Sequence, residues 1–68
     1  MHERLNNRLR EERTRLSLTQ ADLATIVEVS RKTINTVENG VFIPSTVLAL
    51  RLARALRMSV ESLFQLPD

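Results

Sequence analysis

The sequence has 68 residues and contains no cysteine, one histidine, one glycine and two prolines. Without cysteine the chain can form neither a disulfide nor a thiolate metal site. The single histidine, at position 2, is too little for a histidine-based metal site or a catalytic triad. A lone glycine, Gly40, excludes a glycine-rich phosphate loop. No carboxylate pair has a convincing spacing either, so we expect no enzyme, no metal and no cofactor.

Long apolar runs are also missing. No segment approaches the roughly 18 apolar residues that a membrane-spanning helix needs. The N-terminus is charged and lacks the apolar core of a signal peptide. We therefore expect no contact with membranes and a cytoplasmic location.

Charge of one sign is not in large excess, because the formal net charge is only +2. This sum does not by itself indicate a nucleic-acid partner, so the distribution of charge matters more. All the basic residues but Lys32 are arginines, which suit bidentate contacts to phosphate or carboxylate but can equally reflect genomic base composition. A short chain without disulfides buries a small core, which favours an oligomer.

The apolar residues recur at helical spacing, and no stretch alternates long enough to predict a strand. We expect helices at about residues 3–16, 20–27, 31–39, 46–56 and 60–65. The expected N-caps are Thr19, Ser30, Ser45 and Ser59. Gly40 stands where a left-handed C-cap is wanted. Five short helices with short connections predict a single compact all-α domain over residues 1–68.

The helices at 20–27 and 31–39 are joined by about three residues. This spacing is typical of a helix-turn-helix, whose second helix enters the DNA major groove. A small residue is needed where the two helices cross, and Ala24 supplies it. The helix-turn-helix is therefore expected at about residues 19–39.

The segment LTQADLATIVEVSRKTINTVENG, Leu18 to Gly40, resembles the helix-turn-helix of the phage Cro and repressor family, also called the XRE family. The combination of TQ-x-x-L-A, S-x-x-x-I and E-N-G carries this resemblance. Pro44-Ser45, LARAL at 52–56 and SVESLF at 59–64 match as well, so the resemblance covers nearly the whole chain. It implies a lambda-repressor-like fold and binding to double-stranded DNA.

The sequence departs from the family pattern at two positions. Glu28 stands in the turn where glycine is common, and Thr46 stands where leucine is usual. Recognition positions vary across the family, so the residues do not reveal the operator.

The helix at 31–39 has one apolar stripe, formed by Ile34 and Val37. With this stripe against the core, Lys32, Thr36 and Asn39 point most nearly away from it. The resemblance implies that this outer face reads bases, whereas the alternative is an ordinary solvated face. The predicted DNA-binding residues are Gln20, Arg31, Lys32, Thr33, Asn35, Thr36, Asn39 and Ser45.

Two of these residues lie outside the helix at 31–39. The family counterpart of Gln20 touches a DNA phosphate and often braces the first recognition residue, here Arg31. The loop before Ser45 has no lysine or arginine, so main-chain N–H groups and the Ser45 hydroxyl would contact phosphate there. The alternatives are an ordinary polar helix start and simple loop chemistry.

Arg13 and Glu38 are expected to form an ion pair. Arg13 lies in the apolar stripe of its helix, Glu38 flanks a buried stripe, and a charge taken toward the core needs a partner. The resemblance implies a pair at matching positions, and its role would be to orient the helix at 31–39. The alternative is that both side chains reach solvent.

The C-terminal residues Phe64 and Leu66 are candidates for a twofold dimer contact. The alternative is core packing followed by a frayed tail.

These features leave two candidate functions. The first is a sequence-specific transcriptional regulator, a repressor that binds a palindromic operator as a homodimer with half-sites about 34 Å apart. No sensor domain is expected, so blocking of polymerase is the simplest mechanism. The second is a protein-interaction module, such as a DNA-binding antitoxin or an adaptor that acts through a partner protein.

Overall fold

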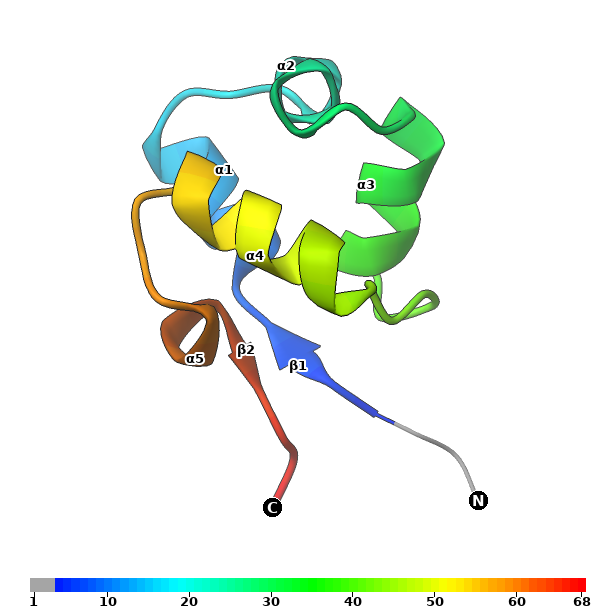
Figure 1. The fold of residues 1–68 in the computed structure, drawn as a ribbon, viewed down its shortest axis with the longest axis vertical. Helices are drawn as coiled ribbons and strands as arrows, with labels where there is room; N and C mark the ends of the chain where they lie inside the picture. Colours follow the sequence, from blue (N-terminus) through cyan, green and yellow to red (C-terminus); the bar gives the residue numbers. More distant parts are fainter. Residues whose placement is uncertain (1–3) are drawn as a thin grey trace.

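The computed structural model describes residues 4–68. Its helices are α1 (Leu9–Arg15), α2 (Gln20–Val27), α3 (Arg31–Glu38), α4 (Thr46–Ala55) and α5 (Val60–Leu63), and its strands are β1 (Asn6–Asn7) and β2 (Phe64–Gln65). The expected all-α fold with five helices is confirmed, and the two-stranded sheet is a minor addition. Figure 1 shows α2 at one end of the molecule and the strands with the C-terminus at the other.

The prediction was wrong at both ends of the chain. The first helix begins at Leu9 and not near residue 3, because β1 pairs with β2 in an antiparallel ribbon that sets Asn7 opposite Phe64. The Oδ1 of Asn7 accepts the backbone N–H of Leu9 at 3.0 Å, a local bond that competes with helix before Leu9. The last helix ends at Leu63 because Phe64 is extended. Residue 3 lies outside the described residues.

The helix starts agree with local capping chemistry. The Thr19 hydroxyl accepts the Asp22 N–H, and the Asp22 carboxylate accepts the Thr19 N–H, both at 2.9 Å. This reciprocal pair satisfies donors that the first turn of α2 leaves unpaired. The serines before α3, α4 and α5 each accept one backbone N–H at 3.1 Å: Ser30 from Thr33, Ser45 from Leu48 and Ser59 from Ser62.

Four helix ends share one left-handed geometry, which the sequence predicted only at Gly40. The φ angles are 59° at Ser17, 63° at Glu28, 73° at Gly40 and 60° at Arg57. After each of these residues a backbone N–H bonds five residues back at 3.0 Å: Leu18 to Arg13, Val29 to Ala24, Val41 to Thr36 and Met58 to Ala53. This pattern closes the exposed carbonyl end of a helix. This type of helix end requires a left-handed residue but not glycine, since Ser17, Glu28 and Arg57 adopt the same conformation as Gly40.

The core lies between the helices and is almost wholly aliphatic. Its fully buried large side chains are Leu9, Leu23, Ile34, Val37, Leu52, Leu56 and Leu63. Glu12, a charged residue, is 9% exposed, and its carboxylate accepts the Arg15 Nε at 2.7 Å. In the same range no helix is long and apolar enough to cross a membrane.

Candidate nucleic-acid interface

Helices α2 and α3 form the helix-turn-helix. Glu28 adopts the left-handed conformation just after α2 and turns the chain, and Ser30 then caps α3. Ala24 is 4% exposed, in keeping with the need for a small side chain near the crossing. Leu23 and Ile34 are fully buried in the core that both helices share. The angle of α3 therefore depends on packing against α2.

Helix α3 has one buried edge and one exposed edge. Ile34 and Val37 are buried. The exposed side chains are Arg31, Lys32, Asn35 and Asn39, while Thr33 and Thr36 are half-buried. The Thr36 hydroxyl donates to the Thr33 carbonyl at 2.9 Å, so it is bound to its own helix. The two cations at the start of α3 form no ion pair within residues 4–68.

The starts of α2 and α3 border a common open hollow. Gln20, Arg31, Lys32 and Asn35 line it. The prediction that Gln20 lies beside Arg31 agrees with this hollow, but the Gln20 side chain does not hydrogen-bond Arg31. Its Nε2 donates to Asn35 Oδ1 and to Glu38 Oε1, each at 3.2 Å. Gln20 thus braces the second half of α3 and not its first residue.

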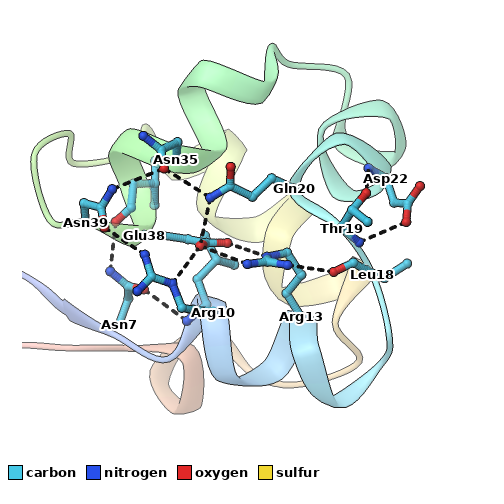
Figure 2. Close-up of polar contacts among 12 residues, drawn as sticks. Asn7, Arg10, Arg13, Leu18, Thr19, Gln20, Asp22, Asn35, Glu38 and Asn39 are labelled. Atoms are coloured by element: carbon cyan, nitrogen blue, oxygen red, sulfur yellow. Dashed lines mark hydrogen bonds and ion pairs between the residues drawn. The ribbon is translucent and has the colours of Figure 1, made fainter.

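The carboxylate of Glu38 is the centre of a buried polar cluster (Figure 2). Its side chain has 0% exposure. Arg13 Nε donates to Oε2 at 2.6 Å and Arg13 Nη2 to Oε1 at 3.2 Å. Arg10 Nε donates to the same Oε1 at 3.3 Å, and Gln20 adds the bond given above. Three side chains from α1 and α2 therefore hold one carboxylate of α3.

These partners decide the charge state of Glu38. Burial alone would raise the pKa of its carboxyl, but the hydrogen bonds from Arg13 and Gln20 and the charge of Arg13 outweigh burial and hold that pKa below its ordinary value. The hydrogen bond to Glu38 raises the pKa of Arg13 against the effect of its own burial. Both groups are charged at neutral pH, which a buried site tolerates only with such bonding.

Arg13 also connects the cluster to the chain before α2. Its Nη1 donates to the Leu18 carbonyl at 2.8 Å, so one guanidinium joins α1, the following connection and α3. Arg13 is 14% exposed at its side chain and Glu38 is not exposed at all, so the pair is directed inward. Its geometry ties α3 to α1 through bonds within the protein.

Sequence analysis did not identify two further residues, Arg10 and Asn7, that bond the end of α3 beside the Glu38 cluster. Arg10 Nη2 donates to Asn39 Oδ1 at 2.8 Å, and Asn7 Nδ2 donates to the Val37 carbonyl at 3.0 Å. Arg10 lies three residues before Arg13, on the same side of α1, and this spacing was the signal that could have indicated it. Asn7 acts through β1, which no sequence pattern predicted.

The other predicted residues lie apart from the cluster. The Ser45 hydroxyl is exposed and accepts the Leu48 N–H as the cap of α4. Phe64 is 7% exposed and belongs to the core, so it has little surface to offer another chain. Leu66 is 79% exposed and lines an open hollow with Arg4, Leu5 and Ile43.

Comparison with known proteins assigns the chain to a family. Residues 9–63 match the helix-turn-helix family HTH_3. A relative from Methanothermobacter thermautotrophicus is 48% identical over 61 residues, covering 88% of each chain. The YgzD protein of Bacillus subtilis is 34% identical over 64 residues, covering 94% of this chain and 97% of its own. Both are named as uncharacterised HTH-type transcriptional regulators, and neither as an enzyme.

A solved structure has a similar fold. The restriction-modification controller protein C.AhdI from Aeromonas hydrophila matches with a TM-score of 0.76 and 38% identity. The match covers 81% of this chain and 83% of C.AhdI. The expected resemblance to the XRE family is thereby confirmed, and the chain belongs to the HTH_3 family of XRE-type helix-turn-helix proteins.

Proposed function

We propose that this chain is a sequence-specific, DNA-binding transcriptional regulator that places α3 in the major groove. The observation that carries the proposal is the outer edge of α3. Arg31 and Lys32 stand exposed at its start without a carboxylate partner in the described residues, while Ile34 and Val37 anchor the opposite edge. Such free donors suit guanine O6 and N7 in the major groove. The relatives' names as regulators support the same function.

The remaining residues divide between bases and phosphates. We propose Thr33 and Thr36 for apolar contacts with thymine methyl groups and Asn35 for a polar contact to a base. Gln20 contributes through its backbone N–H at the first residue of α2, because its side-chain hydrogens are already bonded within the protein. The loop before α4 and Ser45 would contact phosphate, without a cationic side chain of their own.

We further propose that two copies bind a palindromic operator. An eight-residue helix is only about 12 Å long, so one α3 reaches too few base pairs for a unique site. A twofold dimer repeats the contact on half-sites about 34 Å apart. Leu66 with its neighbours Leu5 and Ile43 is the proposed dimer surface, and Phe64 supports it from the core side.

Occupancy of an operator that overlaps a promoter would exclude polymerase, so repression is the simplest proposed outcome. A DNA-binding protein acts where the DNA lies, and the cytoplasm is the proposed location for that reason.

Selection from random-sequence duplexes at two salt concentrations tests the proposal. The wild-type chain should enrich a palindrome with half-sites about one helical turn apart. Arg31→Ala combined with Lys32→Ala should abolish the enrichment. Arg51→Ala combined with Arg54→Ala removes the same charge from α4 and should retain it.

Other outcomes would contradict the proposal. Sequence-blind binding that disappears at the higher salt would mean that only the nonspecific phosphate attraction is present. Recovery of a stoichiometric partner protein, without an enriched operator, would favour the interaction module. Sedimentation of the wild-type chain and of Leu66→Asp tests the dimer separately, because the charge should dissociate it.

A further inference from the structure

The amide side chains at the start of α2 and along α3 form a chain of hydrogen bonds with fixed direction. The two ends of this chain are charged groups. Arg10 is a guanidinium and can only donate, whereas the ionised Glu38 can only accept. Amide oxygen and nitrogen are otherwise hard to tell apart by shape, so an amide's orientation is decided by its bonding partners. Here the partners are unambiguous.

From the donor end, the orientation follows through Asn39. Arg10 Nη2 donates to Asn39 Oδ1 at 2.8 Å, so the oxygen of Asn39 must face Arg10. Its Nδ2 then faces Asn35 and donates to Asn35 Oδ1 at 3.2 Å. A flipped Asn35 would set one NH2 group against another. The donor end therefore turns the Asn35 oxygen inward.

From the acceptor end, the orientation follows through Gln20 and gives the same result. Glu38 Oε1 accepts from Gln20 Nε2 at 3.2 Å, so the nitrogen of Gln20 is turned inward. The same nitrogen donates to Asn35 Oδ1 at 3.2 Å. Figure 2 shows both dashed lines meeting at the Asn35 oxygen, with its nitrogen on the far side and the Gln20 oxygen pointing away from Glu38.

The consequence concerns what Asn35 offers to a ligand. Its oxygen receives two hydrogen bonds, which fill both lone pairs. Its Nδ2 donates to no acceptor within residues 4–68, and the side chain is exposed beside the hollow that Arg31 and Lys32 also line. The free edge of Asn35 thus consists of two N–H donors and no acceptor.

We infer that Asn35 reads guanine and not adenine, because the bonds anchored on Arg10 and Glu38 leave it a donor-only edge. The usual bidentate contact of asparagine to adenine needs its oxygen to accept from N6. That oxygen is occupied here, while guanine presents two acceptors, O6 and N7, to the two free N–H groups. Asn39 and Gln20 act as positioning residues. The inference rests on the proposed DNA-binding function.

A first measurement needs no DNA. Side-chain NH2 exchange with solvent can be followed by NMR in the free protein. The NH2 groups of Gln20 and Asn39 should exchange more slowly than that of Asn35, since theirs are bonded and its own is free. Arg10→Met should speed exchange at the Asn39 NH2 group. Arg8→Met is the control, because Arg8 also lies beside α1 but bonds Glu12 and takes no part in this chain of hydrogen bonds; it should leave the Asn39 exchange rate unchanged. Slower exchange at Asn35 than at the other two would overturn the inference.

The second measurement compares selected operators. The wild type should show a guanine preference of about tenfold at one position of each half-site, and Asn35→Ala should lose it. Asn35→Asp keeps two inward-facing bonds but presents an acceptor outward, so the preference there should move to cytosine, whose N4 donates. Arg10→Met removes one of the two constraints on Asn35 and should weaken the preference at the same position, while Arg8→Met should leave it unchanged.

The two measurements distinguish failure of the guanine assignment from failure of the proposed DNA-binding function. A wild-type operator in which Asn35→Ala changes only an adenine position would overturn the base assignment while DNA binding stands. Absence of any enriched operator would overturn the proposed function and the base assignment with it, whereas the exchange rates would still report the orientation of the amides.

Discussion

Two contact regions between helices, called here the polar seam (α1 with α3) and the apolar seam (around α4 and α5), are built differently. Between α1 and α3, charged and amide groups meet: Arg10 and Arg13 bond Glu38, whose side chain is closed to solvent. Around α4 and α5, contact is aliphatic, with Leu52 and Leu63 fully buried, and no ion pair in residues 4–68 involves either helix. Apolar contact is non-directional, whereas hydrogen bonds depend on angle. The apolar seam therefore supplies stability, and the polar seam orients α3.

The apolar seam should show the largest effect on stability. Leu52→Ala removes a side chain with 0% exposure and leaves a cavity, so the free energy of unfolding should fall by roughly 2–5 kcal/mol. Urea unfolding followed by circular dichroism measures it. Leu50→Ala, the same change at an exposed position of α4, is the matched control and should cost far less. Equal losses would contradict the packing described.

The polar seam should respond differently to removal of one partner and of both. Arg13→Met leaves Glu38 with Arg10 and Gln20, and the free energy of unfolding should fall by about 2 kcal/mol. Adding Glu38→Leu to Arg13→Met removes the stranded charge and should recover much of that loss. Operator selectivity should not recover in full, because Gln20 then loses the Glu38 carboxylate and keeps only its bond to Asn35. Recovery of both properties would break the distinction between the two seams.

Lowering the pH should weaken the polar seam and leave the apolar seam nearly unchanged. The folded pKa of Glu38 lies below its ordinary value of 4.5, so its stabilising contribution is present above that pH and is lost as pH falls through the folded pKa. The difference in unfolding free energy between wild type and Arg13→Met should therefore be largest near neutral pH and should narrow as pH falls below 4.5 through the folded pKa. The difference for Leu52→Ala should stay nearly constant. Chemical unfolding across this pH range checks both, and a parallel decline would contradict the assignment.

The smallest expected effect lies in the turn between α2 and α3. Glu28 has a φ of 63°, which costs a residue with a Cβ about 1 kcal/mol. Glu28→Gly should remove this strain and raise the midpoint of thermal unfolding by a few degrees, measured by calorimetry. Glu11→Gly makes the same change inside α1, where glycine is unfavourable, and should lower it. A lower midpoint for both would mean that Glu28 carries contacts that outweigh its strain.

Local chemistry explains what could be predicted from the sequence. The bounds of α2 were predicted correctly and those of α3 to within one residue, because Thr19 and Ser30 cap their helices through bonds that span three residues. The strands escaped prediction because two residues carry no period and pair only across the whole chain. The left-handed ends at Ser17 and Arg57 escaped because neither residue type favours that conformation.

The candidate site divides in the same way. The helical period, a property of one helix alone, placed Lys32 on the outer edge of α3 and Arg31 on its flank. It could not assign Gln20 to Asn35 or Arg10 to Asn39, since those bonds join residues from different helices. Whether these residues contact DNA stays a prediction.

Periodicity and capping act within a few residues, so the amino-acid order alone was enough to indicate which segments are helical, which edge of each helix is apolar and which family the motif resembles. The groups that surround Glu38 and the direction in which Asn35 turns followed only from the packed fold. Those features depend on how α1, α2 and α3 cross, because hydrogen-bond direction is defined only once the partners from separate helices are in place.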